Sequence, residues 1–116
     1  MATTYKNAQI SASAGGVGVY DTLYNTPNST TAAVISSIVV CNTASTSATY
    51  RIGIMSSAGT PSGANWLVYG ATVNANDTVT LTLGISLPAG ASANNFIRIS
   101  ASATTVSFHA FVSEIS

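Results

Sequence analysis

The residues that could carry catalytic chemistry are few. His109 is the only histidine among 116 residues, and Asp21, Asp77 and Glu114 are the only carboxylates. A serine triad would need His109 beside an acid, and acid/base catalysis by paired carboxylates would need two of the three acids to converge. No G-x-S-x-G segment supplies a nucleophile. We therefore predict that the chain is not an enzyme and that His109 is a strand residue that packs or hydrogen-bonds.

The residues that could bind a metal ion are equally scarce. Cys41 is the single cysteine, so no internal disulfide can form, and with His109 and three scattered acids it makes a poor ligand set for zinc. Asp77 in NANDT could offer one carboxylate to calcium, which is usually too few. An Asn-Asp pair more simply shapes a turn. We predict no metal site and no bound cofactor.

Aromatic side chains are the remaining candidates for binding. They could form a platform for sugars, but filling the core or a subunit contact is the favoured interpretation. The candidate interface or ligand-contact residues are Tyr5, Tyr20, Tyr24, Trp66 and Tyr69.

Two segments that must position these residues alternate between apolar and polar side chains, as half-buried strands do. In TVTLTLG (78–84), Val79, Leu81 and Leu83 fall on one face and the threonines on the other. In ATYRIGIM (48–55), Arg51 falls on the polar face. The apolar face there carries Ala48, Tyr50, Ile52 and Ile54.

A third segment, AVISSIVVC (33–41), is apolar on both faces when it is read with strict alternation. Such a strand belongs in the middle of a sheet that is covered on both sides, so Cys41 is expected to be buried and slow to react. The alternation slips between Phe108 and Val112, which predicts a bulge there. The two faces of the segment would be Ile35, Val39 and Cys41 against Val34, Ile38 and Val40.

Helical periodicity is nearly absent, and turn signals rich in Gly, Pro and Asn recur at short spacing. About eight short strands separated in this way predict an all-β fold, a single-domain antiparallel β-sandwich of jelly-roll-like type over residues 1–116. The segment 1–18, which contains a run of small residues, is expected to act as an N-terminal arm or strand that contacts a neighbour.

The shortage of charge limits the partners. Charged residues make up 5% of the chain, against about 25% in a typical soluble protein, and the six charges cancel. Three basic residues cannot neutralise many phosphates or anionic lipids, so we expect neither nucleic acid nor a membrane as partner. No secretory signal or membrane-spanning run is seen. A free protein uses surface charge to resist association, so the composition favours a subunit packed against fixed neighbours.

Four segments carry a resemblance to a known family. They are MATTYK at the start, LYNTPNSTTAAVISSIVVCNTASTSATYRIGI (23–54), YGATVNANDTVTLTLGISL (69–87) and ATTVSFHAFVSEI (103–115). Together they resemble a family of small virion proteins of tailed phages, whose pattern includes VISxIVVCN, ATYRIAI, ANDTxTLTLG and SFxAFxSEI. The chain departs from that pattern in the turn 25–28 and in a longer loop at 56–65. The resemblance implies a place in the virus particle and no particular chemistry.

The expected function is therefore a non-enzymatic virion structural protein of a tailed bacteriophage, most simply a capsid decoration or cement subunit. The alternative is a neck, tail or fibre-associated protein that binds host glycans, and a third hypothesis is a free carbohydrate-binding module. The expected partners are further copies of the chain, as a trimer or ring, and other virion proteins such as the major capsid protein. The expected location is the virion, assembled in the host cytoplasm. The sequence leaves the position in the particle and the copy number open.

Overall fold

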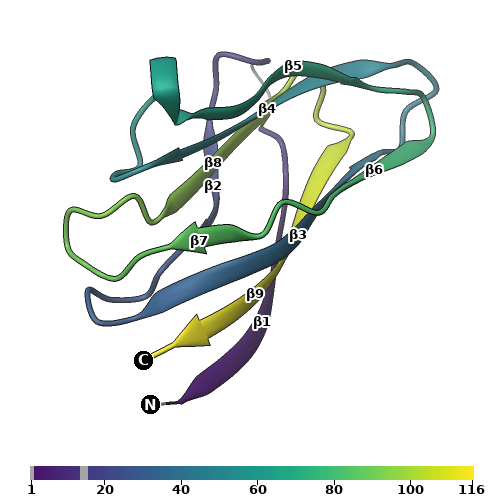
Figure 1. Cartoon of the computed structure of the whole chain (residues 1–116). Helices are drawn as coiled ribbons and strands as arrows, with labels where there is room; N and C mark the ends of the chain where they lie inside the picture. Colours follow the sequence, from purple (N-terminus) through teal and green to yellow (C-terminus); the bar gives the residue numbers. More distant parts are fainter. Residues whose placement is uncertain (1, 14–15) are drawn as a thin grey trace.

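The computed structural model describes residues 2–13 and 16–116, which form two antiparallel sheets packed face to face (Figure 1). A 3-10 turn, η1 (Gly63–Asn65), precedes β5. The strands are β1 (Thr3–Ser11), β2 (Asp21–Asn25), β3 (Ala32–Asn42), β4 (Ala48–Met55), β5 (Trp66–Val73), β6 (Asp77–Leu81), β7 (Ile85–Leu87), β8 (Phe96–Ala101) and β9 (Val106–Ile115).

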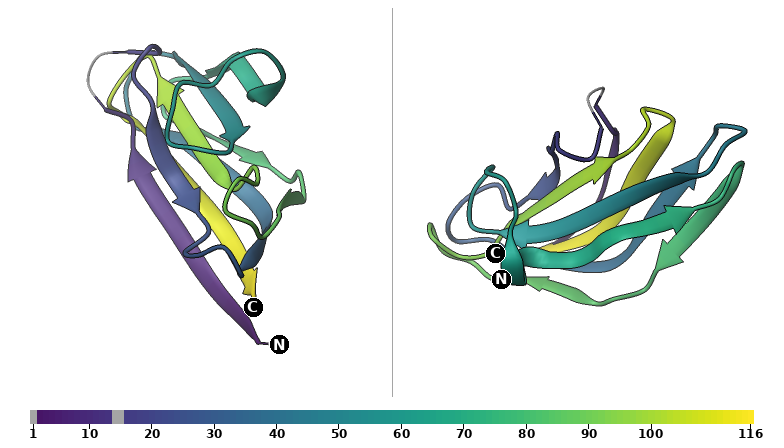
Figure 2. Two further views of the ribbon diagram at one scale, coloured as in Figure 1. Left: turned by 90° about the vertical axis from the view of Figure 1, so that its left-hand side faces the viewer. Right: turned by 90° about the horizontal axis from the view of Figure 1, so that it is seen from above.

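The strand order is that of a jelly roll. Sheet 1 has the order β1-β9-β3-β6, with β7 also paired to β3, and sheet 2 has the order β2-β8-β4-β5. The two sheets lie over one another with their strands running in similar directions (Figure 2). If β6 and β7 are counted as one interrupted strand, eight strands remain, four in each sheet. The predicted all-β sandwich is confirmed, and the ninth strand arises because the chain breaks at 82–84, where Gly84 has φ +59°.

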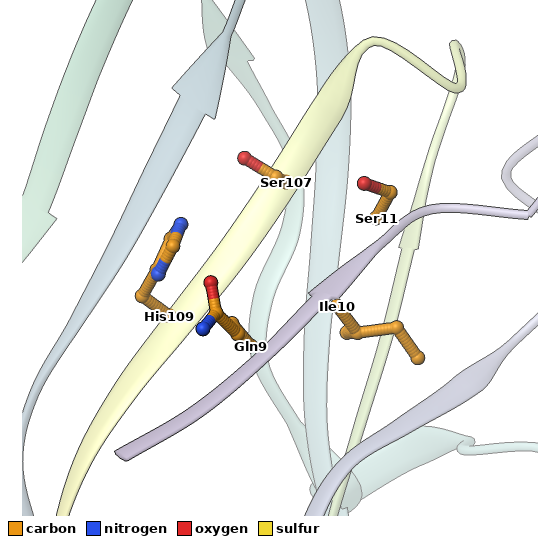
Figure 3. A pocket seen from close by; sticks show the side chains of 5 residues that line it. All are labelled: Gln9, Ile10, Ser11, Ser107 and His109. Atoms are coloured by element: carbon orange, nitrogen blue, oxygen red, sulfur yellow. The ribbon is translucent and has the colours of Figure 1, made fainter.

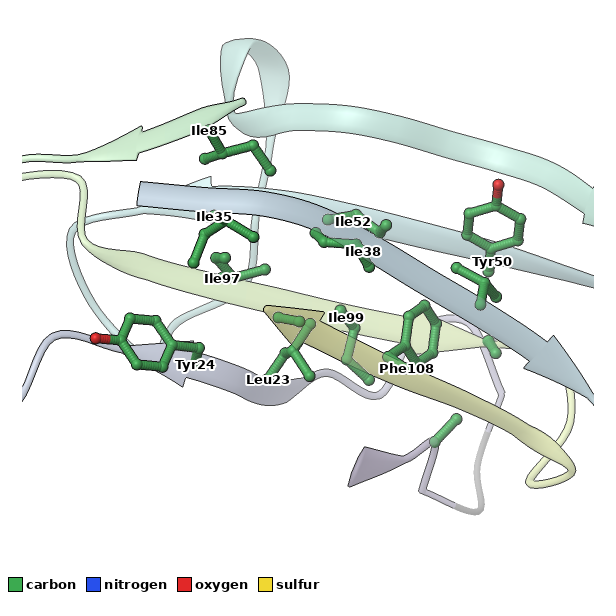
Figure 4. Packing of buried hydrophobic residues seen from close by; sticks show 14 of the residues in the cluster. Leu23, Tyr24, Ile35, Ile38, Tyr50, Ile52, Ile85, Ile97, Ile99 and Phe108 are labelled. Atoms are coloured by element: carbon green, nitrogen blue, oxygen red, sulfur yellow. The ribbon is translucent and has the colours of Figure 1, made fainter. Parts of the chain in front are cut away.

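The core is the layer between the two sheets, and alternate residues of both inner faces fill it (Figure 4). Tyr50 of β4 and Phe108 of β9 meet edge to face across this layer, with ring centroids 6.2 Å apart. The alternation predicted for 48–55 is confirmed. That predicted for 78–84 holds only within β6, because Leu83 lies beyond the strand and is 49% exposed.

The central strand β3 contains a bulge that strict alternation did not predict. Its register with β9 shifts between Ile35 and Ser37, so Ile35 and Ile38 both point into the core with no exposed surface. The Ser36 hydroxyl donates a hydrogen bond to the Phe111 carbonyl, at 3.3 Å, beside the shift. The faces predicted for 33–41 are therefore wrong, since Ile35 shares a face with Ile38 and Val40.

The bulge predicted between Phe108 and Val112 is also wrong. Strand β9 runs in continuous register with β1 over nine residue pairs, and its inward side chains alternate without a break. The irregularity lies on the facing strand, where Ile35 pairs with Val112 and Ser37 with Phe111. An extra residue in β3 shifts the pairing without changing the alternation of β9.

A buried asparagine joins three turns at one end of the sandwich. Asn42, at the end of β3, has 1% of its surface exposed. Its amide nitrogen donates to the carbonyls of Thr46 (2.9 Å), Asn74 (3.3 Å) and Val73 (3.5 Å). Its amide oxygen accepts from the Ala44 N–H and the Thr105 hydroxyl, both at 3.1 Å. One side chain thus joins the turns after β3, β5 and β8.

A buried carboxylate joins the two sheets near the other end of β9. Glu114 lies on the inner face of sheet 1, where it forms an ion pair with Lys6 of β1 at 3.0 Å and accepts a hydrogen bond from the Tyr24 hydroxyl of β2 in sheet 2. Burial alone would raise the pKa of Glu114, but the hydrogen bonds from Tyr24 and Lys6 and the Lys6 charge outweigh it and lower the pKa below its ordinary value.

We expect Asn42→Ala to lower the free energy of unfolding by about 3 kcal/mol, because it leaves several buried backbone groups without partners. Denaturant unfolding would measure this loss. Asn94→Ala is the matched control, since Asn94 is exposed in a turn, and should change stability by less than about 0.5 kcal/mol. Equal stability of the two variants would contradict the role given to Asn42.

We expect the free energy of unfolding to depend on Glu114 in acid. A carboxyl whose pKa is lowered by folding stabilises the native state above its unfolded pKa, near 4.5, and this contribution is lost as pH falls through the lowered folded value. Unfolding of wild type and Glu114→Gln between pH 7 and pH 3 should show a weaker acid dependence in the variant. Asp77→Asn, which removes an exposed carboxylate, should retain the wild-type dependence.

Candidate functional site

The outer face of sheet 1 carries no Asp, Glu, Lys or Arg side chain. The pairing registers of β1, β9, β3, β6 and β7 place alternate residues on this surface, which we call the neutral face. It consists of Thr3, Tyr5, Asn7, Gln9 and Ser11 of β1, Ser107, His109, Phe111, Ser113 and Ile115 of β9, Ala32, Val34, Ser37, Val39 and Cys41 of β3, and Thr78, Thr80 and Ser86.

The neutral face also presents apolar side chains to solvent. Tyr5 is 80% exposed, Phe111 42% and Val34 39%, while Val39 and Cys41 are half-buried. The expectation that β3 is covered on both sides is therefore wrong for the isolated chain, and so is the burial predicted for Cys41. Exposed apolar strands without guarding charges are prone to association with other molecules.

A hollow of about 220 Å³ opens on the neutral face between β1 and β9. It is lined by Gln9, Ile10, Ser11, Ser107 and His109, and Figure 3 shows Gln9 and His109 side by side on neighbouring strands. The small side chains of Ser11 and Ser107, which face one another in the register, leave the space. No carboxylate is among these lining residues, so His109 has no orienting acid there.

The outer face of sheet 2 carries an aromatic cluster around Arg51. The Arg51 guanidinium carbon lies 4.2 Å from the ring centroid of Tyr69 and 5.7 Å from that of Trp66. Trp66 contacts Tyr69 edge to face at 4.9 Å and Tyr20 at 5.8 Å, and Arg51 Nη1 donates to the Tyr20 hydroxyl at 3.1 Å. Cation–π contacts of this kind hold a guanidinium in place over the rings.

The rest of this face is occupied by the chain itself. Arg98 donates from all three nitrogens, to the carbonyls of Gly59 (3.1 Å) and Tyr20 (3.0 Å) and to the Thr22 hydroxyl (2.7 Å). Pro61 of the loop 56–65 packs directly over Gly53, where an added Cβ would come within 2.9 Å of the proline ring. The outer face of sheet 2 is therefore charged and partly covered, in contrast to the neutral face.

The five aromatic residues predicted as contacts separate into three groups. Tyr20, Trp66 and Tyr69 meet at the Arg51 cluster, whereas Tyr5 lies on the neutral face of the other sheet. The prediction that Tyr24 is a contact residue is wrong, because Tyr24 is only 9% exposed and its hydroxyl donates a hydrogen bond to the buried Glu114. Burial and this hydrogen bond raise the Tyr24 pKa. Tyr24 belongs to the core and cannot serve as a surface contact.

The polar residues that hold the structure together, and Arg51 as the centre of the aromatic cluster, were not predicted from the sequence. The one available signal for Arg51 was its place on the polar face of 48–55.

Within residues 2–13 and 16–116, no three His, Cys, Asp or Glu side chains gather closely enough to hold a metal ion. In the same part of the chain, no helix has the length and apolar character needed to cross a membrane.

Comparison with known proteins gives distant structural matches alone. No family model matches the sequence, and no curated protein is similar to it. A structure of infectious bursal disease virus, Gx strain, matches with 17% identity and a TM-score of 0.47 over 97% of this chain. A structure of the Gt strain matches with 14% identity and a TM-score of 0.47 over 98%. The chain spans 31% and 33% of those proteins. Similarity at this level leaves the function to be argued from the chain's own surfaces.

Proposed function

We propose that the chain is a non-enzymatic virion structural protein of a tailed bacteriophage that decorates or cements the capsid. The observation that carries this proposal is the neutral face, a sheet surface with exposed Tyr5, Phe111 and Val34 and no charged side chain. Burial of such a surface against a neighbour removes apolar groups from water and leaves no ion to desolvate.

Most of the few charges are already engaged within the subunit. Lys6 and Glu114 pair with each other, Arg98 is bound by three oxygens of its own chain, and the Asp21 carboxylate accepts hydrogen bonds from the Ser13 backbone (3.1 Å) and hydroxyl (2.8 Å). Electrostatic steering therefore has little to act through. Attachment would instead rest on apolar burial and backbone hydrogen bonds.

Two further considerations support a virion role. The sequence resembles small tailed-phage virion proteins over most of its length, and the jelly-roll strand order is one that virus capsids use. The same order also occurs in lectins and other unrelated proteins, so the fold alone decides nothing. The neutral face is the feature that favours an assembly subunit over a free binding module.

Purified particles of the virus that encodes the chain should contain the protein. Mass spectrometry against the major capsid protein would give its stoichiometry, and hundreds of copies rather than about a dozen would indicate a capsid rather than a neck or tail position. Raising salt from about 0.05 to 0.5 M screens surface charge and should release little protein, whereas mild denaturant should release it. Absence from the particles would overturn the proposal, and release by salt alone would overturn the mode of attachment.

Cys41 provides an internal readout of the same experiment. It is half-buried on the neutral face, between Ser107 of β9 and Thr78 of β6, so a thiol reagent should label it in the free subunit. In intact particles the labelling should be strongly slowed if the neutral face is covered. Equal labelling rates in the two states would show that a different surface makes the attachment.

A second candidate function is glycan binding by a tail or fibre protein, and the Arg51 cluster favours it. Tyr69 remains 63% exposed although Arg51 covers one face of its ring. Arg51 uses one hydrogen bond, to Tyr20, among the described residues, so donors remain for a sugar hydroxyl or carboxylate. An open ring beside a held guanidinium suits a sugar with a carboxylate group.

Trp66 is the only tryptophan, so its fluorescence reports on this cluster. If the cluster binds acidic sugars, polygalacturonate oligomers should change the Trp66 emission, neutral oligomers should do so less, and Tyr69→Ala should abolish the change. Tyr5→Ala, which removes an exposed tyrosine from the other sheet, should leave it intact. An unchanged emission with both sugars would remove this candidate.

A further inference from the structure

Strand β1 is an edge strand whose hydrogen-bonding direction can be assigned residue by residue. The Ala2 and Ser116 backbones exchange hydrogen bonds (2.9 and 3.1 Å), and the Ala12 N–H donates to the Val106 carbonyl (2.9 Å). In an antiparallel pair these bonded positions recur at every second residue. The backbone N–H and C=O groups of the even-numbered residues of β1 therefore point toward β9. Those of its five odd-numbered residues point outward along a free edge. Those residues are Thr3, Tyr5, Asn7, Gln9 and Ser11.

These five residues also place their side chains on the neutral face. Tyr5 is the most exposed large apolar residue described, at 80%, and it lies on the same strand and face as the hollow beside Gln9 and Ser11. One strand therefore carries unpaired backbone groups, an exposed aromatic ring and a space that could receive such a ring.

We propose that a second copy of the chain pairs with this edge, so that two β1 strands run antiparallel about a two-fold axis with Asn7 opposite Asn7 of the partner subunit. Only the odd-numbered residues of β1 have backbone N–H and C=O groups that point to the free edge. In the paired strands, an odd-numbered residue of one copy must therefore lie opposite an odd-numbered residue of the other. Centring on Asn7 overlaps all nine residues of the strand and allows about ten backbone hydrogen bonds. The two copies of sheet 1 then form one continuous sheet, as in β-augmentation.

The same register brings each exposed tyrosine to a partner's hollow. Tyr5 faces Gln9 of the partner subunit, and directly opposed residues in an antiparallel pair point to the same side of the sheet. The Tyr5 ring then lies beside the space that Ser11 and Ser107 leave open. Because the contact is two-fold, each copy gives one ring and receives one.

The edge carries one feature that usually discourages such pairing, the charge of Lys6 on the inner side of the strand. That charge is neutralised by Glu114 of its own chain, and the strand has neither a proline nor a register shift against β9. The other three sheet edges are less suitable: β2 is short and has a register shift, β5 has two shifts and Gly70 at φ +77°, and the β6–β7 edge breaks before Gly84. Among the described strands, β1 offers the longest regular edge.

This inference rests on the proposed function as an assembly subunit, but it is tested on the purified chain without particles, so the two can fail separately. Sedimentation velocity up to about 100 µM should show a dimer for wild type. Asn7→Pro removes an N–H that faces the free edge, which an edge strand tolerates, and should give a folded monomer. Asn7→Ala keeps the N–H and should remain dimeric.

Ala8→Pro is the matched control for backbone direction, because the Ala8 N–H faces β9. It should lower the stability of the fold, which circular dichroism during denaturation would measure. Tyr5→Ala should weaken the dimer, whereas Tyr69→Ala, on the other sheet, should not. A monomeric wild type, a trimer or ring, or a dimer that survives Asn7→Pro would overturn the proposal, since each would exclude pairing of two β1 edges.

A disulfide tests the register. In a Cys41→Ser background, Asn7→Cys should cross-link to itself on mild oxidation, since bonded antiparallel pairs have Cα atoms about 5.5 Å apart, within disulfide range. Thr3→Cys should not cross-link, because the two copies of that position would be separated by roughly 25 Å along the strands. Cross-linking through Thr3→Cys, or its absence through Asn7→Cys, would overturn the Asn7-centred register.

Discussion

The choice of which β3 side chains face the core is the constraint on which the rest of the sandwich depends. This strand pairs with β9, β6 and β7 and also packs against sheet 2, so a slip of one residue would turn half of its apolar side chains outward. The extra residue at Ser36 allows Ile35 and Ile38 to face the core together. A second irregularity lies on the other side of β3, where its register with β6 and its register with β7 differ by one residue.

Polar side chains then fix the two ends of this layer. Asn42 joins three turns at one end, and Glu114 joins Lys6 and Tyr24 at the other. Fully hydrogen-bonded buried groups of this kind specify one arrangement of the strands. The ion pair buries the Glu114 carboxylate while Lys6 stays half exposed, so one of the six charges is removed from the surface and another is neutralised by a partner in the same chain.

The sequence was sufficient for the fold class because most strands alternate regularly, as in 48–55. It was insufficient for β3, because two consecutive serines give no sign of which one is the extra residue. The Arg51 cluster needed the pairing of β4 with β5 and the path before β2, which no local pattern contains. The burial of Asn42 follows from the convergence of three loops, which no local pattern reveals. The local alternation of apolar and polar residues predicted the strands, whereas the pairing of strands distant in sequence determined which residues meet at each site.

An uncharged face and a long free edge are liabilities for a protein that stays alone, because both promote unspecific association. In this chain the free edge and one margin of the neutral face share the same five odd-numbered residues of β1, whose backbones face the edge while their side chains lie on that face. One neighbour in one register can therefore satisfy the backbone of the edge and cover the exposed Tyr5. The pairing would leave the part of the neutral face centred on β3 open to a different, larger partner. Two kinds of contact, one between copies and one with a supporting surface, can thus be made by a single sheet with almost no charge.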